Sequence, residues 1–208
     1  MKVLIINGSP NKNGCTSASL SELSKTLKKQ GIDTETIFVG NKDIRGCIGC
    51  GYCRKNGNCV FNDIVVEIAS KFEEADGLVI GTPVYYAGVN GTLKSLLDRL
   101  FFSTSFNKCM KVGAAIISSR RAGSTSAFDD INKYFTICGM PVVSSTYWNE
   151  VHGSTSNDVS LDKEGLQTIR NLGKNMAFLI KSIRLGKDEY GLPEMERKHM
   201  TNFVDGLK

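Results

Sequence analysis

The sequence has few histidines, one tryptophan and no apolar run long enough to cross a membrane. Its 208 residues include two His, four Pro and one Trp. A membrane helix requires about 20 consecutive apolar residues, so we expect a protein without a membrane partner. His152 and His199 lie too far apart in the chain to build a metal site from histidine.

The N-terminal apolar run is also short. Residues 3–6 are apolar and are followed at once by Asn7 and Gly8, which is too little for the core of a signal peptide. We interpret this run as a strand and expect a cytoplasmic protein. Thiols stay reduced in that compartment, so the seven cysteines indicate metal or redox chemistry rather than a disulfide framework.

Strong charge of one sign is absent as well. The net charge is +5 at pH 7, and the lysines and arginines are scattered over segments of helical periodicity. No dense basic stripe is interleaved with aromatic residues, so we expect no nucleic-acid partner. A small anionic ligand suits this mild positive charge at least as well.

What the chain does contain is an alternation of β-branched runs and helical segments. Runs at 2–6, 34–39, 77–81, 112–118 and 142–148 predict five strands, and apolar residues recur every three or four positions between them. This alternation is typical of βαβ units and predicts an α/β protein with a parallel sheet. Asp63 is a predicted helix N-cap, and Gly31 and Gly139 are predicted helix stops.

The length favours a single core, which we assign to residues 1–185. Residues 40–62 form a cysteine-rich loop within this domain. Residues 186–208 carry Pro193, few apolar side chains and mixed charge. We expect this tail to pack on a neighbouring subunit or to fray rather than to form a core of its own.

A loop rich in glycine and hydroxyl side chains joins the first strand to a helix. The free N–H groups and the dipole of a helix N-terminus attract an anion. The loop lacks G-x-G-x-x-G, and Cys-Thr rather than Lys-Ser or Lys-Thr follows Gly14, which argues against a dinucleotide or P-loop site. We predict a single phosphomonoester, the alternative being an ordinary turn. The candidate contacts are Ser9, Pro10, Asn11, Gly14, Cys15, Thr16 and Ser17.

Two further loops follow the third and fourth predicted strands. The carboxyl ends of parallel strands meet at one edge of a sheet, where such folds bind ligands. Tyrosine rings in the second loop suit stacking on a flat ligand, and an arginine in the third suits negative charge or simply solvent. The candidates are Thr82, Pro83, Val84, Tyr85, Tyr86 and Gly88, and then Ser118, Arg120 and Gly123.

The long loop after the second strand holds four clustered cysteines. Cys47, Cys50, Cys53 and Cys59 form C-x2-C-x2-C-x5-C. Four thiolates at such spacing can bind an iron–sulfur cluster. Zinc, a redox-active disulfide or free thiols that only fill space remain open.

These motifs carry a resemblance to known proteins. Residues 8–17 resemble the FMN-phosphate loop of the NADPH-dependent FMN reductase and flavodoxin-like superfamily, and residues 81–99 resemble its second flavin loop and the following helix. The cysteine spacing resembles that of the iron–sulfur flavoproteins. The resemblance implies a flavodoxin-like three-layer αβα sandwich with strand order 2-1-3-4-5, FMN as cofactor, and a [4Fe-4S] cluster on the four cysteines.

The implied function is an FMN-dependent oxidoreductase or electron-transfer flavoprotein. It would take electrons from NAD(P)H or a reduced carrier and pass them to a small molecule or a redox protein. We expect no catalytic side chains, because the flavin performs the chemistry. The resemblance of residues 199–203 implies a homodimer or homotetramer. The alternatives are a cluster-free FMN, quinone or nitro reductase and a non-catalytic, zinc-stabilised binding protein.

Overall fold

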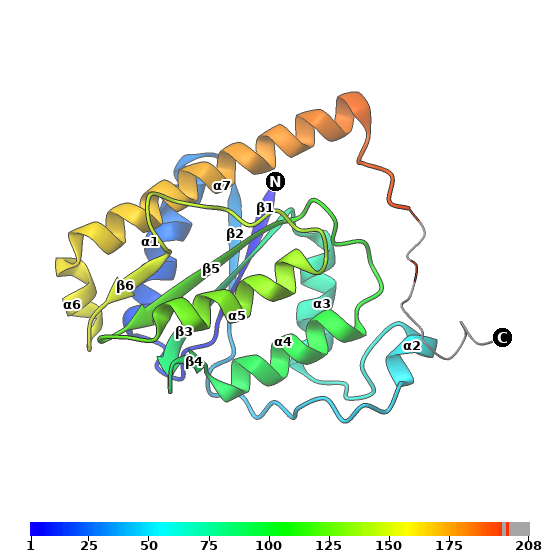
Figure 1. Ribbon diagram of the computed structural model, residues 1–208, viewed down its shortest axis with the longest axis horizontal. Helices are drawn as coiled ribbons and strands as arrows, with labels where there is room; N and C mark the ends of the chain where they lie inside the picture. The colour runs from blue at the N-terminus through cyan, green and yellow to red at the C-terminus, as the bar shows by residue number, and fades with distance from the viewer. Residues whose placement is uncertain (197–198, 200–208) are drawn as a thin grey trace.

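A parallel sheet forms the middle layer of the computed structural model, which describes residues 1–196 and residue 199 (Figure 1). The strands are β1 (Lys2–Asn7), β2 (Asp33–Phe38), β3 (Gly77–Tyr85), β4 (Gly88–Val89), β5 (Val112–Ser119) and β6 (Glu150–His152). The parallel strands lie in the order β2-β1-β3-β5-β6. The observed order differs slightly from the predicted 2-1-3-4-5, because β4 adds a strand and β6 takes the place expected for residues 142–148.

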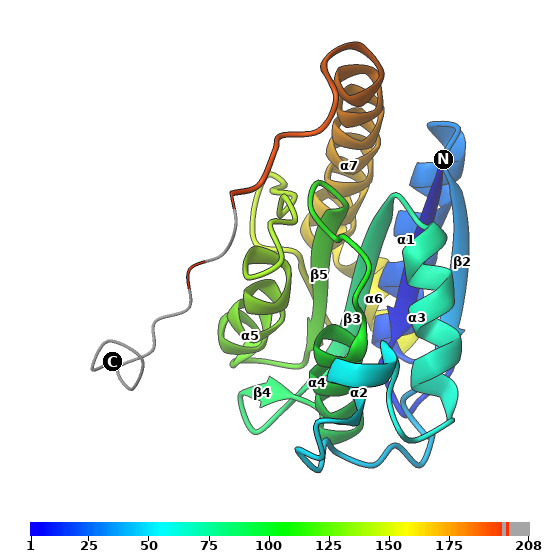
Figure 2. The same ribbon diagram turned by 90° about the vertical axis from the view of Figure 1, so that its right-hand side faces the viewer.

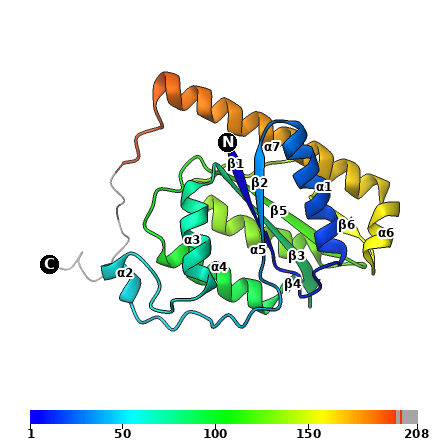
Figure 3. The ribbon, with the colours of Figure 1, turned by 180° about the vertical axis from the view of Figure 1, so that it is seen from behind.

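Helices cover both faces of the sheet (Figures 2 and 3). They are α1 (Cys15–Lys29), α2 (Tyr52–Asn56), α3 (Ile64–Glu74), α4 (Gly91–Ser103), α5 (Ser124–Thr136), α6 (Ser156–Leu161) and α7 (Lys163–Tyr190). Side chains alternate across β1, so that Val3 and Ile5 pack in one core with α1 and α7, whereas Leu4 and Ile6 pack in another with α3, α4 and α5. The predicted three-layer fold is confirmed.

Local signals place several helix ends correctly. The Asp63 carboxylate accepts a hydrogen bond from the Val65 N–H at 3.1 Å and caps α3. Gly31 and Gly139 follow α1 and α5 with positive φ. None of the described helices is long and apolar enough to cross a membrane.

The predicted strand at 142–148 is wrong in its position. Val142 makes one isolated parallel bridge to Gly113, and pairing resumes only at β6. Between Val142 and β6, hydrogen bonds with α7 take the place of hydrogen bonds to a neighbouring strand. The Asn175 amide donates to the Ser144 carbonyl at 2.9 Å, and the Ser145 hydroxyl donates to the Thr168 carbonyl. The chain therefore leaves the sheet where its β-branched residues predicted a strand.

Two features of the fold were not predicted. β4 pairs antiparallel with the end of β3 and forms a short hairpin. Helix α7 continues to Tyr190, past the boundary predicted at residue 185. Of the predicted interface segment 199–203, only His199 lies within the described residues.

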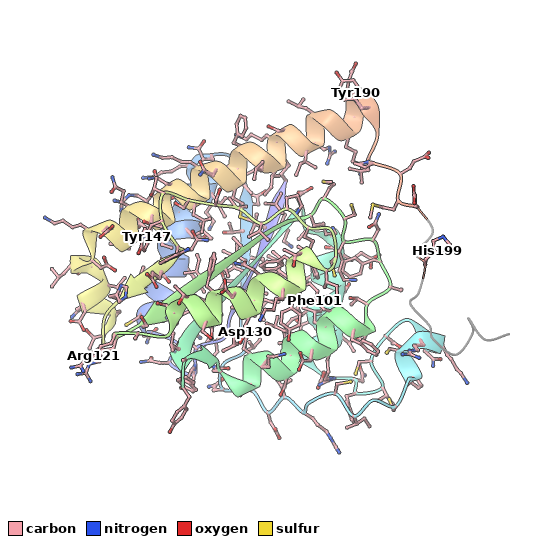
Figure 4. All side chains as sticks on the ribbon, viewed as in Figure 1. Phe101, Arg121, Asp130, Tyr147, Tyr190 and His199 are labelled. Atoms are coloured by element: carbon pink, nitrogen blue, oxygen red, sulfur yellow. The ribbon has the colours of Figure 1, made fainter. Side chains whose placement is uncertain are left out.

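Phe72 gives a test of the core between the sheet and α3. Its buried ring lies 5.2 Å from the ring of Phe106 and 5.8 Å from that of Phe101, which points inward beside α5 (Figure 4). We expect Phe72→Ala to lower the free energy of unfolding by about 3–5 kcal/mol. The matched variant Phe178→Ala, at a ring 71% exposed, should change it by less than about 0.5 kcal/mol. Urea unfolding measures both, and equal midpoints would contradict this packing.

Candidate functional site

A pocket of about 370 Å³ opens at the carboxyl edge of the sheet. The loop after β1, the end of β3, the end of β5 with the following residue, and the loop after β6 line it. Its lining residues are Ser9, Pro10, Asn11, Gly14, Cys15, Thr16, Pro83, Val84, Tyr85, Ser118, Ser119, Arg120, Gly153 and Ser154.

The loop after β1 is held in shape by its own side chains. The Asn7 carbonyl oxygen accepts from the Ser9 N–H at 3.0 Å, while its amide donates to Ser17 Oγ at 2.8 Å. Ser9 Oγ in turn accepts from the Asn11 N–H and donates to the Asn11 carbonyl. Ser17 also donates to the Lys12 carbonyl. The structure thus places the predicted contact Ser17 within the loop's own bonding rather than on the pocket wall.

Helix α1 presents its N-terminus to this pocket. Gly14 is the N-cap, and none of the described side chains accepts a hydrogen bond from the first turn. The first-turn N–H groups are therefore open to an anion at the positive end of the helix dipole. The Thr16 and Ser118 hydroxyls lie 2.7 Å apart and connect the first loop to the third. This arrangement fits a phosphate group.

Two residues far away in the sequence, Gly40 and Asn90, contact the loop after β1 and fix its position. A Cβ at Gly40 would lie 1.8 Å from the Ser9 carbonyl oxygen, so only glycine lets the chain after β2 pass beneath the loop. Asn90 donates from its amide to the Gly8 carbonyl, and its own carbonyl oxygen accepts from the Leu93 N–H at 2.8 Å, capping α4. Neither contact has a local sequence signal.

The second loop is the turn between β3 and β4. Tyr86 and Ala87 both have positive φ, an uncommon conformation for non-glycine residues. Tyr85 lines the pocket and is about half exposed, whereas Tyr86 is fully exposed. Three other predicted contacts also lie outside the lining. Thr82 is buried within β3, where its hydroxyl donates to the Pro83 carbonyl, Gly88 pairs with Tyr85 in the hairpin, and Gly123 packs against Ala87.

The loop after β6 was missed because the last strand was predicted too early. Gly153 and Ser154 follow β6 directly, so a correct strand end would have indicated them. The Gly153 carbonyl accepts from Cys15 Sγ at 3.4 Å, and burial raises the pKa of the Cys15 thiol. Ser119, also missed, has a buried hydroxyl without a partner among the described residues, a polar group available to a ligand.

The four clustered cysteines line a second, apolar pocket. Cys47, Cys50, Cys53 and Cys59 are all free thiols around one small cavity of about 20 Å³. The other wall comes from Phe61 and from the end of α4. Within the described residues, no three metal-ligating side chains converge on a point that would hold a single ion. The four predicted ligands therefore lie around one cavity.

Helix α4 extends from the neighbourhood of the first pocket to the cysteine pocket. It begins at Gly91, beside the β3–β4 turn, and its residue Phe102 lines the cysteine pocket. In Figure 1 the loop with α2 runs along α4 and places α2 at the helix's far end. Eleven helical steps of 1.5 Å separate Gly91 from Phe102, about 16 Å along the axis.

Comparisons with known proteins agree with this architecture. The model of the family described as NADPH-dependent FMN reductase matches residues 1–155. An iron–sulfur flavoprotein of Methanocaldococcus jannaschii is 38% identical over 192 residues, covering 88% of this chain and 100% of that protein. An iron–sulfur flavoprotein of Methanosarcina thermophila is 32% identical over 193 residues, covering 91% and 100%.

Solved structures show the same fold at low identity. RosB with a bound 8-demethyl-8-formylriboflavin-5'-phosphate intermediate has a TM-score of 0.70 and 16% identity, covering 98% of this chain and 93% of RosB. An NAD(P)H:quinone oxidoreductase from Methanothermobacter marburgensis has a TM-score of 0.66 and 16% identity, covering 85% and 96%. The chain is therefore a flavodoxin-like member of the NADPH-dependent FMN reductase family, and its relatives include proteins named iron–sulfur flavoproteins.

Proposed function

We propose that this protein is an FMN-dependent oxidoreductase that takes electrons from NAD(P)H or a reduced carrier and passes them through FMN and a [4Fe-4S] cluster. The observation that carries the proposal is the uncapped N-terminus of α1, which opens into the pocket at the carboxyl edge of the sheet. Family membership supports FMN as the phosphate-bearing ligand.

Each loop would have a separate task toward FMN. The first turn of α1 and the hydroxyl of Thr16 would bind the phosphate, while Val84 and Tyr85 would flank the ring. Arg120 would bring positive charge to the same pocket. When bound, FMN supplies the hydride and electron chemistry. The described lining contains no carboxylate and no histidine, which agrees with a site where side chains hold the cofactor rather than exchange protons.

Two observations support an iron–sulfur cluster rather than zinc on the cysteine loop. Three of the four cysteines lie in one short run, C-x2-C-x2-C, whereas zinc sites more often use two separated pairs. Relatives that cover most of this chain are named iron–sulfur flavoproteins. We propose Cys47, Cys50, Cys53 and Cys59 as its ligands.

Assembly and partners complete the proposal. We propose a homodimer or homotetramer, with a small molecule or a redox protein as electron acceptor. Arg120, the one charged residue of the described pocket lining, suits a donor that carries phosphate groups.

Gly40 tests the phosphate loop. We expect FMN to bind at least about tenfold more tightly than riboflavin, which lacks the phosphate, because the α1 N-terminus binds that group. Gly40→Ala should weaken FMN binding by about tenfold or more and riboflavin binding by less, since the new Cβ displaces Ser9. Gly186→Ala, where a Cβ meets open space, is the control. Quenching of flavin fluorescence measures all three, and equal binding of FMN and riboflavin would refute the phosphate site.

The cysteine assignment predicts iron content. After anaerobic reconstitution with iron and sulfide, the wild type should hold about four irons per chain. Cys50→Ser should hold less than about half of that, because it removes one ligand. Cys109→Ala, at a buried cysteine outside the pocket, should match the wild type. Stoichiometric zinc in place of iron would favour the zinc-stabilised alternative.

Arg120 and Arg121 form a matched pair. Both side chains are exposed, but Arg120 lines the pocket, whereas Arg121 lies outside the lining and points away from the molecule (Figure 4). We expect Arg120→Met to slow anaerobic flavin reduction by NAD(P)H several-fold, because positive charge there attracts a phosphate-bearing donor. Arg121→Met should leave the rate within about twofold. Stopped-flow absorbance gives both rates, and equal effects of the two variants would remove Arg120 from the site.

A further inference from the structure

A buried arginine forms part of the wall of the cysteine pocket. Arg99 lies near the end of α4 and is only 1% exposed. A guanidinium stays charged at all physiological pH values, so its burial requires a partner charge and hydrogen bonds for its donors. Its hydrogen bonds show which groups the guanidinium fixes in position.

Asp63 fixes the plane of the guanidinium. Nη1 donates to Asp63 Oδ2 at 2.7 Å, and Nη2 donates to Asp63 Oδ1 at 2.9 Å. This two-point ion pair is among the strongest that side chains form. The same carboxylate caps α3 through the Val65 N–H, so both partners sit on rigid helices.

The remaining donors reach both ends of the cysteine loop. Nη1 donates to the Arg45 carbonyl at 3.1 Å, just before Cys47, and Nη2 donates to the Phe61 carbonyl at 3.4 Å, just after Cys59. The guanidinium also lies 5.0 Å from the centre of the Phe61 ring. One side chain thus connects the two points where the loop leaves and rejoins the body of the protein.

The last donor points at a sulfur. Arg99 Nε donates to Cys59 Sγ at 3.3 Å. Within the described part of the chain, no side chain donates a hydrogen bond to the sulfur of Cys47, Cys50 or Cys53. The four proposed ligands are therefore unequal, and Cys59 is the one held by a cation.

We propose that Arg99 is a positioning residue that closes the cysteine loop, fixes Cys59 Sγ and raises the reduction potential of the bound cluster. This inference rests on the cluster assigned above. Reduction of the cluster adds one electron, delivered by reduced flavin or a reduced carrier, and breaks no bond. The added negative charge strengthens the attraction to the guanidinium and the N–H···S hydrogen bond, and such contacts set cluster potentials.

The test compares Arg99→Lys with Arg45→Lys in the anaerobically purified holoprotein. An ammonium keeps the charge but cannot reproduce the planar set of five donors. Arg45 lies on the same loop with its guanidinium 5.3 Å from the centre of the Phe61 ring, and its side chain makes no hydrogen bond to Cys59. In a redox titration followed by electron paramagnetic resonance, we expect Arg99→Lys to lower the ratio of reduced to oxidised cluster about tenfold at fixed potential, or about 59 mV.

Arg45→Lys should change that ratio by less than about threefold. If Arg99→Lys fails to fold, Arg99→Gln combined with Asp63→Asn removes both charges of the ion pair together, and a downward shift is expected because the hydrogen bond from Arg99 Nε to Cys59 Sγ is lost. An unchanged potential in a cluster-containing Arg99 variant would overturn the inference.

A second readout does not require a cluster. In the apoprotein, backbone amides of residues 46–60 should exchange hydrogen faster in Arg99→Lys than in the wild type or Arg45→Lys, because the loop loses its connection at both ends. A wild type that binds no iron would refute the proposed cluster, while exchange would still test the closure of the loop. Equal exchange in all three proteins would overturn that closure.

Discussion

The parallel direction of the main strands is the constraint on which the rest of the structure depends. It brings the carboxyl ends of β1, β3, β5 and β6 to one edge, so loops far apart in the sequence line one pocket. A helix N-terminus carries a partial positive charge. Because α1 begins at this edge and none of the described side chains caps its first turn, the pocket favours a negatively charged ligand. The phosphate site proposed above therefore relies on backbone N–H groups of α1.

The two proposed redox sites have different structural foundations. The flavin pocket is built from loops at the end of a rigid sheet, whereas the cysteine pocket is built from a long loop packed on α4. Such a loop loses much conformational entropy when it is fixed. Arg99 offsets part of this cost by joining both ends of the loop to α3 and α4 through Asp63. Helix α4 thereby supports both sites, since its N-cap Asn90 also holds Gly8.

Local patterns predicted much of this molecule. The periodicity of apolar residues identified the layers, and the glycine and hydroxyl residues before α1 identified the loop that lines the pocket. The cysteine spacing indicated that four thiols lie close together, and in the structure they line one cavity. These features depend on residues close together in the sequence, where spacing alone constrains geometry.

Long-range contacts could not be predicted in this way. Nothing near Gly40 indicates that it passes beneath Ser9, and nothing near Asn90 indicates that it reaches Gly8. The last strand was misplaced because Asn175, on α7, bonds the Ser144 carbonyl in place of a neighbouring strand. For Arg99, no local pattern indicates burial, because its partner Asp63 lies 36 positions away.

The central claim is that one chain carries both FMN and a [4Fe-4S] cluster, and an anaerobic reductive titration tests it most directly. FMN accepts two electrons and the cluster one, so the anaerobically purified protein should consume about three electrons per chain before its visible absorbance stops changing. Uptake of about two, with flavin bleaching alone, would contradict the claim and leave a cluster-free flavin reductase.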